Sequence, residues 1–184
     1  MQITGGKFRG LRLRSLPSQQ VRPTARRVRE LLFELLAERI KGARFVDLCA
    51  GSGAVGLEAL SRGASHVTFV DRSPRACIFV RTNLQTCNIT TEQSIVVVSS
   101  ALKFLRGAIE RNACAWDIAY FDPPYAIDYT PVLTLFATTK LLNPRGLLVA
   151  EHHCGRQPEA GGELDYVGTA ELGETCLSFF ERKH

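Results

Sequence analysis

Residues 45–60 read FVDLCAGSGAVGLEAL, and this stretch decides the fold. A short apolar run passes into a glycine turn and then into a helix-like pattern. Glycine lets the backbone approach a ligand closely, and a helix N-terminus presents free N–H groups. Gly51, Gly53 and Gly56 have the G-x-G-x-x-G spacing, and Asp71 ends another apolar run 20 residues after Gly51. The stretch therefore predicts a strand–turn–helix unit that binds a cofactor carrying a ribose.

The rest of the chain repeats this alternation of strand and helix. Strand-like runs occur at residues 45–49, 67–71, 94–98, 117–121 and 146–151. Ser73-Pro74 has the pattern of an N-cap followed by proline at the first helical position, opening a helix to about Cys87. The segments 164–167 and 175–181 predict a closing hairpin. This order predicts one α/β domain with a mostly parallel, doubly wound sheet and an antiparallel C-terminal strand.

A second informative stretch is Asp122-Pro123-Pro124-Tyr125, which follows the apolar run 116–121. The two prolines stiffen the exit from a strand, so a purely structural interpretation is a rigid turn between a strand and a helix. The chemical interpretation is a pocket for a conjugated amine. The Asp122 carboxylate and the Pro123 carbonyl would accept its two N–H groups and direct its lone pair, while Tyr125 would stack on the base. The candidate catalytic residues are Asp122, Pro123, Pro124 and Tyr125.

Two cofactors fit the glycine turn. A nicotinamide dinucleotide matches the fingerprint, but Asp47 at the strand end would repel its pyrophosphate, and 184 residues leave little room for a substrate domain. S-adenosylmethionine suits Asp47, which could hold its amino group, and it explains the amine pocket on a later strand. We therefore expect S-adenosylmethionine as the cofactor and no metal. The candidate cofactor-binding residues are Asp47, Gly51, Ser52, Gly53, Asp71, Arg72, Ser100 and Ala101.

Positive charge is concentrated at the start of the chain. Residues 1–44 hold 11 Lys and Arg against three Glu, whereas the whole chain has a net charge of +5. Leu11 and Leu13 alternate with Arg12 and Arg14, so a strand there would project its arginines to one face, and Gly5-Gly6 could turn it back as a hairpin. Thr24 is expected to cap a helix. That helix would carry an apolar stripe at Val28, Leu31, Leu32, Leu35 and Leu36. These basic residues could simply form a solvated surface without a binding role.

Combined with the amine pocket, the basic segment is better explained as a platform for nucleic-acid phosphates. We expect residues 1–44 to form an RNA-facing extension and residues 45–184 to form the catalytic domain. The candidate RNA-binding residues are Lys7, Arg9, Arg12, Arg14, Arg22, Thr24, Arg26 and Arg27.

The cysteine and histidine residues add little chemistry. The six cysteines show no C-x-x-C spacing, so a zinc site is not expected. They are interpreted as reduced, mostly buried thiols of a cytoplasmic protein without a membrane segment. His152 and His153 are neighbours on an expected strand and should face opposite ways. Glu151, at the end of the fifth strand, lies either near the site or in solvent.

Over essentially its whole length the chain resembles the RsmD family of small-subunit rRNA guanine-N2 methyltransferases. The resemblance is carried by residues 3–10, by Arg22-Pro23-Thr24, by residues 27–30 and 32–33, by the glycine turn and by residues 122–125. The glycine turn and Asp-Pro-Pro-Tyr are common to many amino-methyltransferases, whereas the amino-terminal segments are specific.

The resemblance implies a Rossmann-like class I methyltransferase fold, S-adenosylmethionine as donor, and one guanine of 16S rRNA in an assembled or nearly assembled small subunit as acceptor. It also implies that Asp47, Gly51, Gly53 and Asp71 bind the cofactor. The pocket for the guanine amino group would be formed by Asp122, Pro123 and Tyr125. Where many methyltransferases place an acid against the cofactor's adenine, this chain has Ser99-Ser100-Ala101, and Ser100 could still bond that edge. The alternatives are a DNA adenine-N6 methyltransferase, another amino-methyltransferase such as one acting on protein glutamine, and a non-catalytic RNA-binding module.

Overall fold

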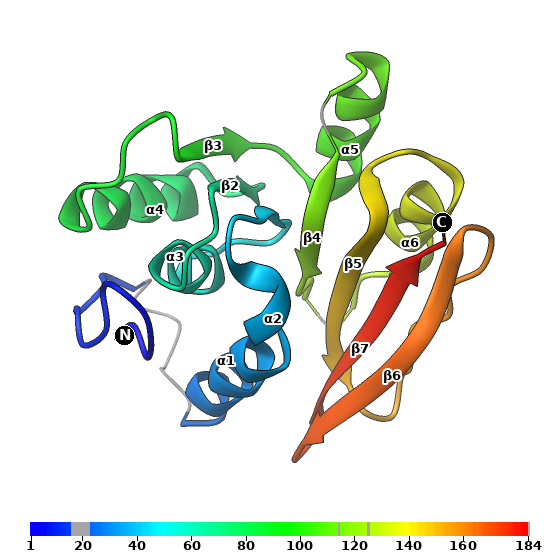
Figure 1. Ribbon diagram of the computed structural model, residues 1–184, viewed down its shortest axis with the longest axis horizontal. Coiled ribbons are helices and arrows are strands. Elements are labelled where there is room, and N and C mark those ends of the chain that lie inside the picture. The colour runs from blue at the N-terminus through cyan, green and yellow to red at the C-terminus, as the bar shows by residue number, and fades with distance from the viewer. Residues whose placement is uncertain (16–22, 114, 125, 184) are drawn as a thin grey trace.

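Buried apolar runs of the chain pair into one seven-stranded sheet (Figure 1). The computed structural model describes residues 1–15, 23–113, 115–124 and 126–183. The strand order is β3-β2-β1-β4-β5-β7-β6. The strands are β1 (Arg44–Asp47), β2 (His66–Asp71), β3 (Ser94–Val98), β4 (Trp116–Phe121), β5 (Leu142–His153), β6 (Leu164–Leu172) and β7 (Thr175–Arg182). The first five are parallel, and β7 runs antiparallel to both β5 and β6. The mostly parallel sheet with an antiparallel C-terminal strand is confirmed.

Helices cover both faces of this sheet. They are α1 (Pro23–Leu35), α2 (Ala37–Ile40), α3 (Ala54–Ser61), α4 (Pro74–Thr86), α5 (Ala101–Glu110) and α6 (Thr130–Thr138). Alternate residues of each strand face opposite ways. Accordingly Phe45 belongs to a core shared with α1 to α4, whereas its neighbour Val46 belongs to a core shared with α5 and α6. The result is a three-layer sandwich.

The strand register brings the ends of the parallel strands together. Asp47 pairs with Tyr120, and Phe121 pairs with Ala150. The next residues on β4 and β5, Asp122 and Glu151, are therefore neighbours at one edge of the sheet. Functional side chains predicted from separate stretches thus meet there, as expected for an open parallel sheet.

Two strands are longer than predicted by several residues. β5 begins at Leu142 rather than 146, with a shift of register opposite residues 116–118. β6 continues to Leu172 beyond its predicted end at residue 167: a bulge between Tyr166 and Gly168 leaves Val167 without a partner in the register, and Gly168 pairs with Phe179. The predicted helix after Ser73 is confirmed, and the Ser73 hydroxyl accepts a hydrogen bond from the Ala76 N–H.

The amino-terminal hairpin exists in a short form and is fixed against α3. Gln2 and Arg12 form an antiparallel bridge, and the chain turns across residues 5–10 rather than at Gly5-Gly6 alone. Gly6 has φ +73°, and a Cβ built there would lie 1.9 Å from the Ser61 carbonyl oxygen. Glycine is therefore required for close approach as well as for its conformation.

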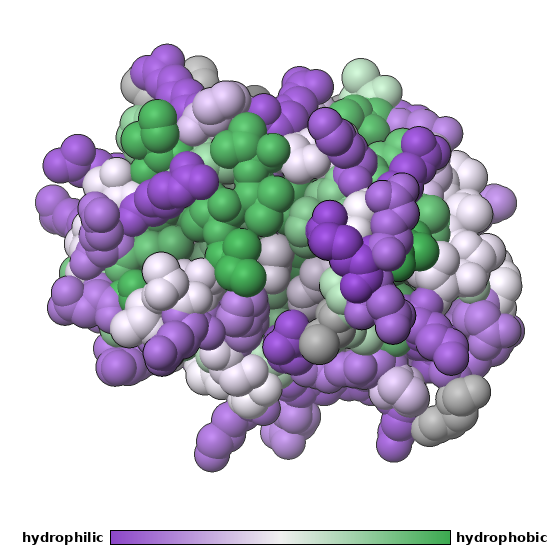
Figure 2. Space-filling model, turned by 90° about the horizontal axis from the view of Figure 1, so that it is seen from above, coloured by the Kyte–Doolittle hydropathy of each residue, from purple (hydrophilic) through white to green (hydrophobic). Residues whose placement is uncertain are grey.

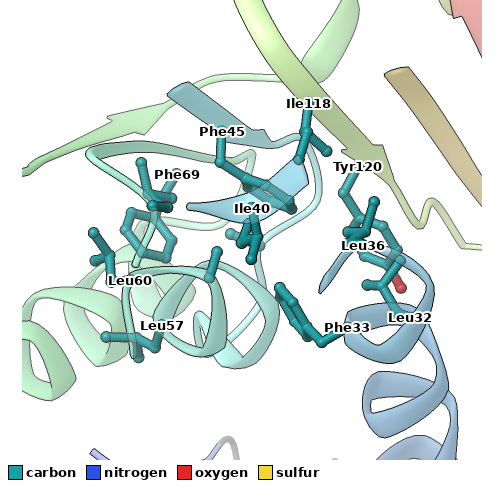
Figure 3. Close-up of a cluster of buried hydrophobic side chains, with 14 of the residues drawn as sticks. Leu32, Phe33, Leu36, Ile40, Phe45, Leu57, Leu60, Phe69, Ile118 and Tyr120 are labelled. Carbon is teal, nitrogen blue, oxygen red and sulfur yellow. The ribbon is translucent and has the colours of Figure 1, made fainter. Parts of the chain in front are cut away.

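Helix α1 corrects two predictions. It begins at Pro23, so Thr24 is its second residue and not its cap. Leu35 is 50% exposed, whereas Phe33, which was left out of the predicted stripe, is fully buried. Figure 3 shows Phe33 directed toward Phe45 and α3, and Leu32 and Leu36 beside Tyr120.

A buried carboxylate joins the amino-terminal segment to α3. Glu58 is fully buried and accepts hydrogen bonds from the Thr4 and Gly5 backbone N–H groups. It also pairs with Arg29 at 3.2 Å and with Arg62 at 3.0 Å. Arg29, which belongs to the basic run, is therefore an internal residue. Residues 1–15 and α1 share a core with the sheet, and the division of the chain at residue 44 remains a prediction.

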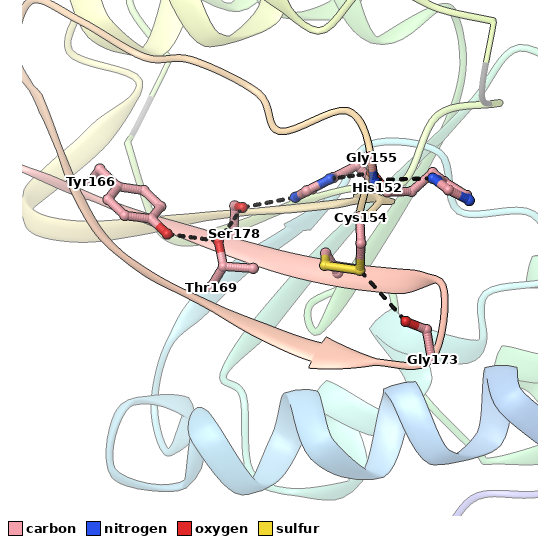
Figure 4. The surroundings of a disulfide bond; sticks show 9 residues. His152, Cys154, Gly155, Tyr166, Thr169, Gly173 and Ser178 are labelled. Atoms are coloured by element: carbon pink, nitrogen blue, oxygen red, sulfur yellow. Dashed lines mark hydrogen bonds between the residues drawn. A yellow bond between two sulfur atoms is a disulfide. The ribbon is translucent and has the colours of Figure 1, made fainter.

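The interpretation of all cysteines as free thiols is wrong for one pair. Cys154 and Cys176 form a disulfide between the ends of β5 and β7 (Figure 4). These strands are neighbours in the sheet, which sequence spacing alone does not reveal. His152 is buried and bonds the Ser178 hydroxyl at 2.8 Å, whereas His153 is exposed, so the two histidines do face opposite ways. In the described part of the chain, no three His, Cys, Asp or Glu side chains are arranged to hold a metal ion. None of the described helices has the length and apolar character that a membrane span requires.

Both edges of the sheet carry exposed apolar side chains. On the β3 side these are Ile78, Ile95 and Val98, and on β6 they are Tyr166 and Val167. Figure 2 shows an apolar area among hydrophilic side chains, in the half of the molecule that holds β3 and α4 in Figure 1.

Candidate active site

A cavity of about 1380 Å³ lies beyond the carboxyl ends of β1, β2, β4 and β5. Its walls combine the glycine turn, the end of β2, the start of α5 and the Asp-Pro-Pro segment. The amino-terminal hairpin and the first part of α1 add a basic rim. Pockets for drug-sized ligands have volumes of roughly 300–1,000 Å³, so this cavity is large enough to hold a nucleoside cofactor and a second group together.

The glycine turn is held by the carboxylate of Asp71. One oxygen accepts the Gly51 N–H and the other accepts the Ser73 N–H, both at 2.8 Å. Each oxygen keeps a lone pair, so the carboxylate retains capacity for a ribose diol. Gly56 packs on β2 so closely that a Cβ would lie 2.2 Å from the Phe69 ring. Gly51 lines the cavity, whereas Gly53, with φ +83°, shapes the turn behind it.

Asp47 is a buried carboxylate that faces the cavity. One oxygen accepts the Gly56 N–H at 3.0 Å. Burial raises the pKa of Asp47 to about 7, and the negative charges of Asp71 and Glu151 add to the shift. A cationic ligand would offset that repulsion. Such an environment suits the ammonium group of an amino acid.

The other predicted cofactor residues play unequal parts. Arg72, Ser100 and Ala101 line the cavity. The Ser100 hydroxyl accepts the Lys103 N–H at 3.4 Å as the cap of α5, and its own proton is still available for donation. Ser52 lines the wall but is almost fully buried, and its carbonyl accepts a hydrogen bond from Asn83.

Asp122, Pro123 and Pro124 line the same cavity and follow β4, which pairs directly with β1. The Asp122 side chain is exposed toward the cavity. Its pKa nevertheless lies well above its usual range, because protein atoms surround it closely and because Glu151 and Asp47 repel its charged form. The Pro124 carbonyl accepts the Ile127 N–H at 2.9 Å, which closes the turn after the two prolines. Tyr125, the predicted stacking residue, lies outside the described residues.

Two further residues, Glu151 and Tyr120, belong to the same site. Glu151 lines the cavity and accepts a short hydrogen bond from the Tyr120 hydroxyl. The Tyr129 hydroxyl donates to the Glu151 backbone carbonyl at 3.1 Å. Burial raises the pKa of both Glu151 and Tyr120. The sequence allows Glu151 to lie either near the site or in solvent, and in the structure it lines the cavity. Tyr120 also lines the cavity, but no sequence signal distinguishes it from the other residues of the strand.

The predicted RNA-binding side chains are exposed where the structure describes them. This holds for Lys7, Arg9, Arg12, Arg14, Arg26 and Arg27. Of these, Arg12 and Arg26 also line the cavity, and Arg26 forms an exposed pair with Glu30 at 2.9 Å. Arg22 and the side chain of Thr24 lie outside the described residues.

Asn83 links this basic rim to the glycine turn through hydrogen bonds. Its side-chain oxygen accepts the Arg14 N–H at 2.8 Å, and its amide donates to the carbonyls of Arg14 and Ser52. The basic face is thereby positioned beside the opening of the cavity.

Comparison with known proteins agrees with this architecture. A family model described as conserved hypothetical protein 95 matches residues 1–181. The ribosomal RNA small subunit methyltransferase D of Haemophilus influenzae is 35% identical over 82% of this chain and 78% of that protein. A solved Escherichia coli structure has a TM-score of 0.86 at 28% identity and covers 100% of this chain and 98% of that one. SMU.776, solved in complex with SAH, has a TM-score of 0.72 at 16% identity over 86% of this chain and 49% of that one. The fold is that of the class I methyltransferases.

Proposed function

We propose that this chain, which belongs to the conserved hypothetical protein 95 or RsmD family, methylates the exocyclic N2 amine of one guanine in 16S rRNA. The chain is an RsmD-type small-subunit rRNA methyltransferase, and its methyl donor is S-adenosylmethionine. The choice of the guanine N2 atom is the part that requires an experiment.

The observation that carries the proposal is the shared cavity. Asp47 and Asp71 supply carboxylates for the amino group and ribose of the cofactor, and Asp122, which lines the same cavity, supplies an acceptor for an amine. Arg12 and Arg26 bring positive charge to the same opening. A donor site, an amine acceptor and a phosphate-binding rim are therefore combined in one place.

The residues of the chain act on the amine in three ways. The Asp122 carboxylate and the Pro123 carbonyl accept hydrogen bonds from the amine and direct its lone pair toward the cofactor side of the cavity. S-adenosylmethionine, when bound, supplies an electrophilic methyl group. As the amine becomes positive, the negative charge of Asp122 stabilises it, and the proton then passes to Asp122 or to water. Tyr125 is assigned the stacking role by its position in the sequence.

The basic rim is assigned to the rRNA backbone. Exposed Lys7, Arg9 and Arg12 and their neighbours would contact phosphates and orient the target guanine, which must leave its stack to enter the cavity. We propose an assembled or nearly assembled small subunit in the cytoplasm as the substrate, with no metal required.

The test is methyl transfer from labelled S-adenosylmethionine to unmethylated small subunits, free 16S rRNA and duplex DNA. We expect label in the small-subunit sample and its loss with Asp122→Ala. Label confined to DNA adenine would reassign the chain to the adenine-N6 class. Cofactor binding without label in any acceptor would direct the search to protein glutamine, and absence of cofactor binding would favour a plain RNA-binding module.

A further inference from the structure

Glu151 lies beside Asp122 at the ends of neighbouring parallel strands. The register pairs Phe121 with Ala150, so the residues that follow extend side by side from β4 and β5. Both residues line the cavity. Adjacent strands are about 4.8 Å apart, so the two carboxylates can contact neighbouring atoms of one planar ligand.

Hydrogen bonds fix the position of Glu151. The Tyr120 hydroxyl donates to one carboxylate oxygen, and the Tyr129 hydroxyl donates to the backbone carbonyl. The Tyr120 side chain is buried in the core that also holds Leu32 and Leu36 of α1, and Figure 3 shows the three together. Because Tyr120 takes one oxygen of Glu151, the second oxygen is the one that remains for a ligand.

The pair of carboxylates selects for a ligand edge that carries only hydrogen-bond donors. Guanine presents N1–H next to its N2 amine, whereas adenine presents a bare N1 next to its N6 amine. A ligand edge that carries only donors favours the ionised form of both acids, because its N–H groups offset their mutual repulsion. In that form Asp122 and Glu151 accept and do not donate. A bare N1 would therefore point its lone pair at a carboxylate, and a guanine edge would instead relieve the repulsion between the two acids.

We infer that Glu151 is a specificity-determining residue that accepts the N1–H of the target guanine while Asp122 accepts its N2 amine. The inference rests on the proposed function and deepens it. It also supplies a structural reason for guanine over adenine, which the Asp-Pro-Pro-Tyr segment alone does not give. Loss of a hydrogen bond to a charged group corresponds to a rate difference of about 10- to 100-fold.

The test compares guanine with 2-aminopurine, which keeps the 2-amine but has no hydrogen on N1. Each base is placed at the modified position of 16S rRNA, once product mapping has located it, and small subunits are reconstituted. The variant is Glu151→Gln, which preserves shape. Its amide oxygen should stay on the Tyr120 hydroxyl, so its N–H₂ group would face the bare N1. Glu171→Gln, on the exposed edge strand β6, is the charge-matched control.

For the unmodified enzyme and the Glu171→Gln control, we expect kcat/KM for guanine to exceed that for 2-aminopurine by about 10- to 100-fold. Glu151→Gln should reduce that ratio to near one or invert it. Adding Tyr120→Phe should restore part of the guanine preference, because the amide can then turn its oxygen to the ligand. An unchanged ratio in an active Glu151→Gln enzyme would overturn the inference and leave the proposed function intact. An unmodified enzyme that methylates no guanine would overturn both.

Discussion

The pKa of Asp47 makes cofactor binding depend on pH in a way that can be calculated. The carboxyl group is buried at the end of β1, and its pKa is raised from 3.8 to about 7. If the ionised form holds the cofactor ammonium, affinity should follow the ionised fraction, which rises from about 3% at pH 5.5 to about 50% at pH 7. The cofactor's own amino group has a pKa of about 8 and stays mostly protonated throughout. We therefore expect affinity for S-adenosylmethionine to increase about 15-fold over this interval.

The assay is calorimetric titration with S-adenosylmethionine in buffers of different ionisation enthalpy. At pH 6 the free carboxyl group is about 90% protonated, so binding should release close to one proton. Asp47→Asn should bind about 10- to 100-fold more weakly at pH 7 and lose both the pH slope and the proton release. Asp165→Asn, a change of the same charge on exposed β6, should keep both.

A wild-type affinity that is constant within twofold from pH 5.5 to 7 would refute this reasoning. So would an Asp47→Asn variant that retains the slope. Either result would assign the ammonium group to a different acid of the cavity.

Three further predictions concern stability, each measured by urea denaturation. Between pH 3.8 and about 7, Asp47 binds a proton in the folded state but not in the unfolded state, so the free energy of unfolding falls as pH rises through that window and then levels off. The total decline is at most about 4 kcal/mol, and Asp47→Asn should remove it. Gly6→Ala should cost about 2–4 kcal/mol because its Cβ meets backbone, against about 1 kcal/mol for Gly173→Ala, which has the same backbone conformation in open space. Glu58→Gln should cost about 3–5 kcal/mol because it leaves a buried guanidinium without its carboxylate, and a cost below 1 kcal/mol would show that the ion pair is dispensable.

The sheet and half of the site could be predicted because they depend on local patterns. The glycine turn, Asp47, Asp71 and the Asp-Pro-Pro segment each follow an apolar run, and parallel strands bring such ends together. Chain-local spacing was therefore enough to place these residues around one cavity.

The rest depends on contacts between segments far apart in the sequence. The Tyr120–Glu151 bond joins residues 31 positions apart and looks from the sequence like two ordinary strand positions. Glu58 lies on α3 and meets Thr4 only because the amino-terminal hairpin docks there, which also removes Arg29 from the basic surface. The Cys154–Cys176 disulfide likewise follows from strand pairing.

The central claim is that the cavity methylates the N2 amine of guanine, and nucleoside analysis of the product tests it most directly. Small subunits lacking the modification would be incubated with the enzyme and S-adenosylmethionine, digested, and separated against nucleoside standards. Asp122→Ala would serve as the control. We expect N2-methylguanosine from the wild-type enzyme and none from the variant. Any other methylated nucleoside, or an equal yield from Asp122→Ala, would contradict the account.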